Sequence, residues 1–139
     1  METYIIIMVI CLIMSAYFSA TETAFSCANK TRLRALAEKG NKKAELAVKL
    51  ADKYDRLIST ILIGNNIVNI LLASMGTMLF VEIFKDTTLA DKAAAISTLV
   101  VTVAVLIFGE ITPKSIANDF PEKFAMFSAP FIRVLIWLL

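Results

Sequence analysis

Residues 57–84 read LISTILIGNNIVNILLASMGTMLFVEIF, an apolar run of 28 residues with a single charged side chain, Glu82. As an α-helix this run would be about 42 Å long, which exceeds the roughly 30 Å hydrocarbon core of a bilayer. Two further largely apolar runs, residues 4–26 and 92–113, lie on either side of it in the sequence. The pattern predicts an all-α membrane protein with three transmembrane helices.

The composition supports the same class of protein. Of the 139 residues, 58% are hydrophobic and 19% are charged, whereas soluble domains have about 45–50% apolar and about 25% charged residues. A net charge of +2 is too small to indicate a nucleic-acid partner. The sequence has no histidine and two cysteines, which excludes Ser-His-Asp catalysis, Cys-His catalysis and a Cys/His zinc site. We therefore expect a membrane protein that is not an enzyme.

The remaining segments are expected to lie beside the membrane. Residues 27–56 show helical periodicity interrupted at Gly40–Asn41, which predicts a linker of two short amphipathic helices. The stretch from about residue 118 to 139 has an apolar part of only 16 residues, and that part contains Arg133. It predicts a juxtamembrane helix that lies in the membrane plane. Residues 1–139 are thus read as one transmembrane domain, and the apolar end predicts that more protein follows.

The distribution of basic residues predicts the orientation. Residues 27–56 hold nine Lys and Arg against four acids, whereas residues 85–92 hold two of each sign. Because basic loops tend to stay in the cytoplasm, the linker is placed there and the N-terminus outside. Three crossings then place the C-terminus in the cytoplasm of a multi-pass cell-membrane protein. An anionic-lipid or nucleotide site in the basic linker is the less favoured reading of the same charges.

Polar side chains recur at one depth of the three predicted spans. Counting 1.5 Å per residue from the cytoplasmic ends places them all in the same half of the bilayer. They are Ser19, Thr23 and Ser26 in the first span, Asn65 and Asn69 in the second, and Gly109–Glu110 in the third. A carboxylate at mid-bilayer costs at least about 2.5–3.5 kcal/mol unless it is paired or hydrated. The hydroxyl groups of Ser15, Ser97, Thr98 and Thr102 in the same spans can be explained by bonds to a helix backbone or to a neighbouring helix, but the amides and Glu110 point to function.

The available ligand atoms indicate which ions such a site would take. Hydroxyl, amide and carboxylate oxygens without His or Cys suit hard cations, namely Mg²⁺, Na⁺ or Ca²⁺. Pro113 has no N–H, so it leaves the Gly109 carbonyl without its usual helical donor and free to face a site.

Three motifs carry a resemblance to a known family: FSATETAFS at 18–26, GNNIVN at 64–69 and GEITPK at 109–114. Together with the basic linker and the trailing apolar helix, they resemble the transmembrane domain of the CorC/CNNM (cyclin M) magnesium transporters. The resemblance covers essentially the whole chain. It implies a homodimer in the lipid bilayer whose chain continues into a cytosolic CBS-pair domain and a CorC domain. Close-packing positions for the dimer would be Ala73, Gly76 and Thr77.

The resemblance also implies a dehydrated, inward-facing cation site between the three spans. Its ligands would be the Ser19 hydroxyl, the Asn65 and Asn69 amides, the Gly109 carbonyl and the Glu110 carboxylate, with Thr23 and Ser26 as weaker additions. The implied activity is Mg²⁺ efflux, proposed to be driven by Na⁺ entry. Two alternatives stay open, namely a membrane anchor and dimerisation module that regulates another transporter, and a transporter that binds mainly Na⁺.

Overall fold

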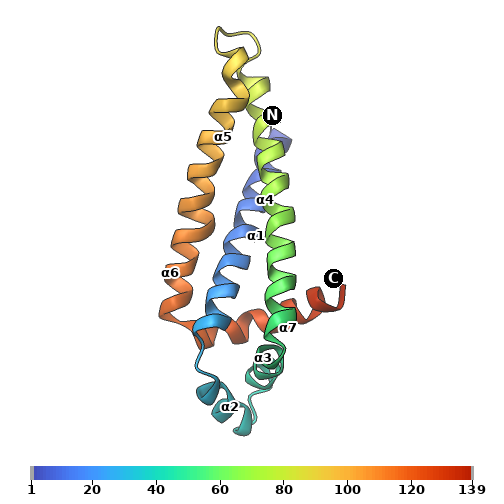
Figure 1. Cartoon of the computed structure of the whole chain (residues 1–139), viewed down its shortest axis with the longest axis vertical. Coiled ribbons are helices and arrows are strands. Elements are labelled where there is room, and N and C mark those ends of the chain that lie inside the picture. The colour runs from blue at the N-terminus through green and yellow to red at the C-terminus, as the bar shows by residue number, and fades with distance from the viewer. Residues whose placement is uncertain (1, 139) are drawn as a thin grey trace.

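Three long helices dominate the computed structural model, which describes residues 2–138 (Figure 1). By length and composition, three helical stretches can cross a membrane: Glu2–Cys27, Tyr54–Phe84 and Ala90–Asp119. In lipid, only a helix satisfies every backbone N–H and C=O within one segment, which explains why these apolar runs are helical throughout. The predicted all-α class with three spans is confirmed.

The helices follow the chain in a simple order. They are α1 (Glu2–Cys27), α2 (Lys30–Glu38), α3 (Lys42–Asp52), α4 (Tyr54–Phe84), η1 (Ala90–Lys92), α5 (Ala93–Ala104), η2 (Val105–Ile111), α6 (Thr112–Asp119) and α7 (Pro121–Leu138). The last four elements before α7 form the third span, which continues past its expected end at Pro113 to Asp119. Pro113 lies in the first turn of α6, directly after η2, so the span continues through the proline with one backbone N–H donor fewer.

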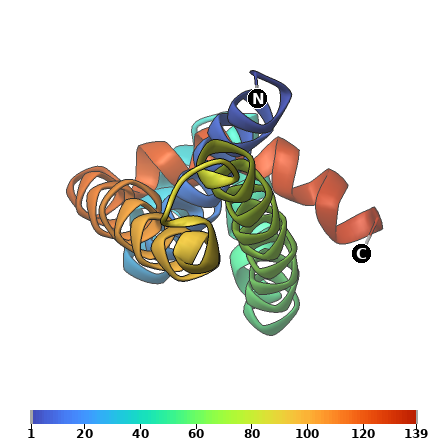
Figure 2. The same ribbon diagram turned by 90° about the horizontal axis from the view of Figure 1, so that it is seen from above.

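The three spans diverge towards one end of the molecule. We call the half of the bundle next to α2, α3 and α7 the linker end, and the half that leads to residues 85–92 the loop end (Figure 1). α4 packs against α5, and α1 packs against α4, η2 and α6. Viewed from the loop end, α4 and α6 lead away from each other in different directions (Figure 2). At the linker end, helix α1 is therefore the element that joins the other two spans.

Two glycines of α4 allow close approach of neighbouring helices. A Cβ atom built on Gly64 would lie 2.8 Å from Cζ of the buried Phe18 ring of α1. A Cβ built on Gly76 would lie 2.7 Å from Cγ2 of Val101 on α5. The prediction that Gly76 is a close-packing position holds, but its neighbour is α5 of the same chain and not a second copy.

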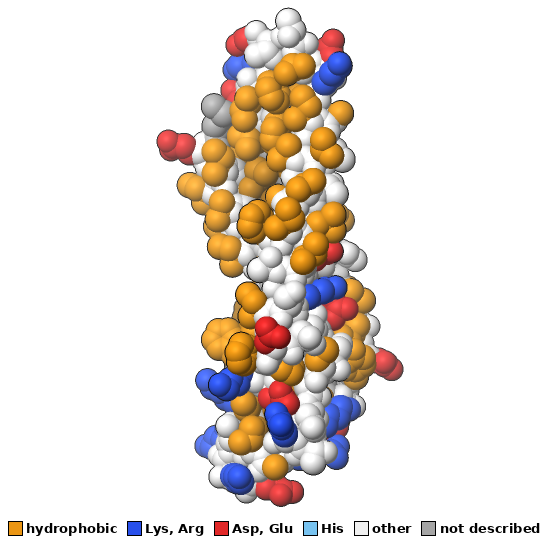
Figure 3. Space-filling model, turned by 90° about the vertical axis from the view of Figure 1, so that its left-hand side faces the viewer, with side chains coloured by type: hydrophobic (Ala, Val, Ile, Leu, Met, Phe, Trp, Pro, Cys, Tyr) orange, Lys and Arg blue, Asp and Glu red, His pale blue; other side chains and the backbone are white. Residues whose placement is uncertain are grey.

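The outer surface of the spans is apolar. Figure 3 shows hydrophobic side chains over the upper part of one face, while charged side chains gather mainly at the linker end, with a smaller group at the loop end. Large side chains such as Ile70, Leu99 and Phe108 are more than half exposed. Exposed apolar surface of this extent is expected where lipid, not water, surrounds a helix. The chain is a membrane-embedded, multi-pass helical protein.

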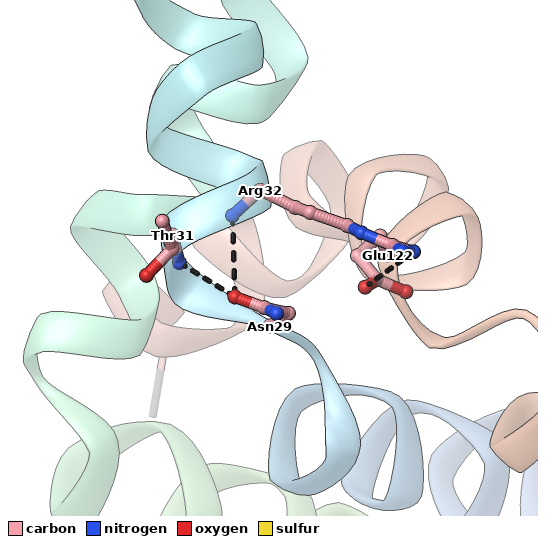
Figure 4. Close-up of polar contacts among 4 residues, drawn as sticks. All are labelled: Asn29, Thr31, Arg32 and Glu122. Carbon is pink, nitrogen blue, oxygen red and sulfur yellow. Dashed lines mark hydrogen bonds and ion pairs between the residues drawn. The ribbon is translucent and has the colours of Figure 1, made fainter.

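The linker between the first two spans folds as a helical hairpin, α2–α3. Oδ1 of Asn29 accepts hydrogen bonds from the backbone N–H groups of Thr31 (2.9 Å) and Arg32 (3.3 Å), which caps α2 (Figure 4). Gly40 makes the turn with a φ of 95°, a conformation that glycine adopts without strain. The Arg32 guanidinium lies 3.7 Å from a carboxylate oxygen of Glu122, which connects the hairpin to α7.

Helix α7 crosses beneath the spans at the linker end (Figures 1 and 2). It contacts α1, α3 and α4. The Tyr17 hydroxyl donates to the Ser128 carbonyl at 3.3 Å, and the hydroxyl oxygens of Thr21 and Ser128 are hydrogen-bonded at the same distance. The residues that face the bundle are Ala125, Ser128, Ala129 and Ile132, all fully buried. This arrangement agrees with the predicted juxtamembrane helix that wraps the end of the domain.

Candidate cation site

Ser15 of α1 is the centre of a polar cluster inside the membrane-spanning bundle. Its hydroxyl lies 2.9 Å from Oδ1 of Asn69 and 3.3 Å from Oδ1 of Asn65, and it donates to these amide oxygens. Ser15 is fully buried, while both asparagines are half-buried. Because Asn65 and Asn69 are one helical turn apart on α4, one hydroxyl reaches both amides.

The third span reaches the same serine through a glycine. A Cβ atom built on Gly109 would lie 3.1 Å from Ser15 Oγ, which is closer than side chains normally approach. Gly109 is buried, and the absence of its side chain lets η2 approach α1 at this level. Ser15 therefore contacts polar or backbone groups of all three spans.

The segment that contains Gly109 and Glu110 is a π-helix. It runs from Val105 to Ile111, and the following Thr112 N–H donates to the Ile107 carbonyl, five residues back. Pro113 cannot supply the N–H that an α-helix would bring to the Gly109 carbonyl. Single π-helical turns within α-helices occur frequently at functional sites. The irregular backbone is found at the same level as the polar cluster, where hydrogen-bonding groups are available.

Glu110 is the carboxylate nearest to this cluster along the chain, directly after Gly109. It is half-buried, and Lys114, four residues further on, is exposed. None of the ion pairs among residues 2–138 includes Glu110, Lys114 or Glu22. A carboxylate within a membrane span that lacks a basic partner favours a cation as its counter-charge.

The three hydroxyl residues predicted on α1 differ in their surroundings. Ser19 is buried and follows Ser15 by one turn, so both lie on the same face of α1. Thr23 is half-buried one turn further on. Ser26 is exposed at the end of the helix, and its hydroxyl lies 2.8 Å from the Tyr54 hydroxyl at the start of α4. The structure thus groups Asn65, Asn69 and Gly109 around Ser15, while Ser26 lies at the edge of the bundle.

Ser15 itself was not among the predicted ligands. Serines in membrane helices often bond to a backbone or to a neighbouring helix, and the sequence alone favoured that role for Ser15. Its bonds do go to a neighbouring helix, but their acceptors are the two asparagines of the candidate site. The four-residue spacing of Ser15 and Ser19 was the signal that places both on the face towards the site.

The donor atoms of this cluster define its chemistry. Among residues 2–138 no group of three or more His, Cys, Asp or Glu residues is close enough to hold a metal ion. The cluster instead offers hydroxyl and amide oxygens, and Glu110 is placed near it only as the residue that follows Gly109 in the chain. Such oxygen atoms are the ligands of hard cations and not of zinc or copper.

Comparison with known proteins identifies the family. The family described as the Cyclin M transmembrane N-terminal domain (CNNM) matches residues 6–139. The chain belongs to the CNNM family. The resemblance seen in the three sequence motifs is therefore confirmed, and the family match covers all three spans, the linker hairpin and α7.

Similar proteins occur in bacteria. An Escherichia coli protein named UPF0053 inner membrane protein YfjD is 44% identical over 133 residues, which cover 91% of this chain and 30% of the relative. A Haemophilus influenzae UPF0053 protein is 42% identical over 136 residues, covering 98% of this chain and 31% of the relative. A Haemophilus influenzae polyamine export protein is 27% identical over 148 residues, covering 96% and 34%. The chain spans about a third of the length of these relatives.

Proposed function

We propose that this CNNM domain binds and transports a hard divalent cation, Mg²⁺, by alternating access. The observation that carries the proposal is the Ser15 cluster, in which one buried hydroxyl joins two amides of α4 and contacts the glycine before Glu110. A cation held there would touch all three spans, so its binding and release would be coupled to their relative movement. The proposed ligands are the side chains of Ser19, Asn65, Asn69 and Glu110 and the Gly109 carbonyl.

The alternative of a passive membrane anchor does not explain the polar cluster. An anchor needs apolar spans and small residues at helix contacts. The loop end has such a contact, in which Gly76 packs against Val101. Asn65, Asn69 and Glu110 add a desolvation cost that packing does not require. The cluster therefore favours transport over anchoring.

Charge and size favour a compact inorganic cation. Sodium accepts the same oxygen ligands, and we retain Na⁺ as the coupling ion for Mg²⁺ efflux. One relative is named a polyamine export protein, and polyamines are elongated organic polycations. A polyamine needs several spaced anionic groups, whereas the candidate site has a single carboxylate, Glu110. This contrast favours a compact inorganic cation for the present chain.

Calorimetric titration of the purified protein tests this proposal. Mg²⁺, Ca²⁺, Na⁺ and spermidine are titrated in turn, and we expect saturable Mg²⁺ binding. Glu110→Gln keeps the size and polarity of the side chain but removes its charge, so it should abolish Mg²⁺ binding. Glu22→Gln is the matched control, because it removes the same charge from a half-buried residue of α1 and should reduce binding less.

The opposite results are equally informative. If Glu110→Gln bound Mg²⁺ as tightly as the unchanged protein, the site assignment would be wrong and the anchor alternative would be preferred. If spermidine bound and Mg²⁺ did not, the substrate would be a polyamine, as the name of the more distant relative says of that protein.

We further propose that the linker end faces the cytoplasm. Residues 27–56 support this orientation, because they contain nine basic and only four acidic residues. Labelling of single cysteines tests it in a Cys27→Ser background, because Cys27 is exposed. Asn41→Cys should react with an impermeant thiol reagent only from the cytoplasmic side, and Thr88→Cys, at the loop end, only from outside. The reverse pattern would overturn the orientation and the inward-facing site.

The working unit is proposed to be a homodimer whose chains continue into cytosolic CBS-pair domains. Three spans that diverge at the linker end leave broad apolar surfaces exposed, which a second copy can cover. The mass of the detergent-solubilised protein, corrected for bound detergent, should be twice the 15.3 kDa of one chain. A mass of one chain at concentrations well above micromolar would contradict the dimer.

A further inference from the structure

A cavity with charged lining residues lies at the linker end, between α3 and α7 and away from the cation site. Its volume is about 400 Å³. It is lined by Leu46, Lys49, Leu50, Asp52, Lys53 and Arg133. The cavity thus has an apolar wall from α3 and a rim that carries three basic side chains and one acidic one.

The ion pairs around the cavity leave it positively charged. The Asp52 carboxylate lies 3.6 Å from the guanidinium of Arg34, and Lys49 lies 3.6 Å from Glu45. Neither Lys53 nor Arg133 takes part in any ion pair among residues 2–138. The cavity therefore has two basic groups without an acidic partner, which makes it a candidate for binding an anion.

The position of the cavity indicates where that anion comes from. Lys53 directly precedes Tyr54, the first residue of the membrane-spanning helix α4. Arg133 lies in α7, whose neighbouring side chains Phe131, Val134 and Trp137 are apolar and exposed. A basic pair at the end of a span, beside exposed apolar side chains, is at the level of lipid headgroups.

We propose that this cavity binds the headgroup phosphate of an anionic phospholipid. The Arg133 guanidinium can bind two phosphate oxygens at once, and Lys49 and Lys53 add positive charge at the rim. The acyl chains would lie along the exposed apolar surface of α7. A bound lipid would fix α7 against α3, and so hold the helix that contacts α1 through Tyr17 and Ser128.

Trp137 provides a local probe for this lipid. It is the only tryptophan of the chain, its relative exposure is 82%, and it follows Arg133 by one helical turn. The protein is placed in vesicles of equal parts phosphatidylcholine and phosphatidylglycerol, with brominated acyl chains on one lipid at a time. Since bromine quenches nearby tryptophan fluorescence, the ratio of the two quenching efficiencies reports which lipid is enriched beside α7.

We expect brominated phosphatidylglycerol to quench more strongly, and we expect the preference to depend on the cavity. A basic group near an anionic membrane contributes an enrichment of about fivefold. Lys53→Gln combined with Arg133→Gln should therefore remove most of the preference. The matched control, Lys42→Gln combined with Lys43→Gln, removes two charges from the same α3 hairpin without touching the cavity lining and should retain it.

A conservative change separates charge from packing. Arg133→Lys keeps the charge and should retain part of the preference, and the Trp137 emission maximum checks that α7 remains in the membrane. Equal quenching by both lipids in the unchanged protein would overturn the proposal. So would a loss of preference in the control pair equal to that in the cavity pair, or a loss in Arg133→Lys equal to that in the cavity pair. If inorganic phosphate removed the preference while sodium chloride of the same ionic strength did not, the cavity would bind a free anion and not a lipid.

Discussion

The two ends of the helical bundle use the same packing device for different purposes. At the loop end, Gly76 lets α4 approach Val101 of α5, and the adjoining cavity of about 220 Å³ is lined by apolar side chains only. At the linker end, Gly109 lets η2 approach Ser15, whose hydroxyl bonds to two asparagines. A glycine contact holds the spans together at one end and brings polar groups together at the other.

The difference between the two contacts indicates which helix contacts of a membrane domain are candidates for function. A helix contact between apolar groups gains packing without any desolvation cost. A contact that buries a serine against two amides costs desolvation and gains only modest hydrogen-bond energy, about 0.5–1.5 kcal/mol for each bond. Polar groups kept at such a cost are the ones proposed to bind a cation.

Among the variants that compare the two ends, the largest effect is expected from removing both amides of the linker-end cluster. Asn65→Leu combined with Asn69→Leu keeps the side-chain size but removes the two oxygen atoms proposed as ligands. Hydrogen bonds or ligand contacts to a charged group contribute about 1.5–3 kcal/mol each, so Mg²⁺ affinity should fall by about 100-fold or more. Calorimetric titration measures the change.

Ser97→Ala is the control for the double variant. Ser97 is also buried, but it faces Gly76 at the loop end. Its replacement should leave Mg²⁺ affinity within about twofold of the unchanged protein, since distant sites are usually independent. Equal losses in the two proteins would show that affinity depends on overall stability and not on the cluster.

A smaller effect is expected when alanine replaces one glycine at each end. The Cβ of Gly109→Ala would lie 3.1 Å from Ser15 Oγ and displace the hydroxyl that orients the amides. Removing an orienting partner of a ligand typically lowers metal affinity by about 10–100-fold. The Cβ of Gly76→Ala would lie 2.7 Å from Val101, and overpacking of this kind costs about 1–3 kcal/mol of stability.

Paired measurements on the two alanine variants test the comparison itself. Gly109→Ala should lower Mg²⁺ affinity with little loss of thermal stability, and Gly76→Ala should lower thermal stability with affinity nearly unchanged. Affinity is measured by calorimetry and stability by thermal unfolding followed by circular dichroism. If both variants changed affinity and stability to the same extent, the two ends would not differ in function.

The sequence was sufficient to predict the fold because lipid restricts which backbone structures can cross a membrane. Runs such as residues 57–84 are too apolar for water and must be helical in a membrane, and Gly40–Asn41 separates the linker helices. The continuation of the third span beyond Pro113 was not predicted. A proline inside an apolar run reads as a helix end, and a π-helical segment leaves no simple pattern in a single sequence.

The candidate site was predicted less completely than the fold. The spacing of Asn65 and Asn69 fixed their common face, and the structure brings both to α1. The serine of α1 that the two asparagines contact depends on how far α1 is displaced along its axis relative to α4. Neither periodicity nor hydropathy specifies that displacement. For the same reason Ser15 was not predicted as a partner of the asparagines. Gly76 was predicted to pack against a second copy of the chain, but it packs against α5. A glycine in a sequence indicates a close helix contact without indicating which helix is the neighbour.

A moderate effect on stability is expected at the cap of α2, outside the membrane. Asn29→Ala removes the Oδ1 atom that accepts two backbone N–H groups at the start of this helix. Loss of such a cap costs about 1 kcal/mol. Hydrogen exchange of the α2 backbone should rise, while Mg²⁺ affinity stays unchanged. A change in affinity would mean that the hairpin contributes to the site.

The smallest effect is expected from the ion pair between the hairpin and α7. The Arg32 side chain is 76% exposed and that of Glu122 is 17% exposed, so water screens the interaction at 3.7 Å. Exposed pairs contribute about 0.2–1 kcal/mol, which a double-mutant cycle of Arg32→Gln and Glu122→Gln should reproduce and added salt should reduce. By contrast, the polar contacts of Ser15 lie within the bundle and should be insensitive to salt. A coupling well above 1 kcal/mol that persists in high salt would show that the hairpin and α7 form one rigid unit, and the distinction between a buried polar cluster and a screened surface contact would then no longer hold.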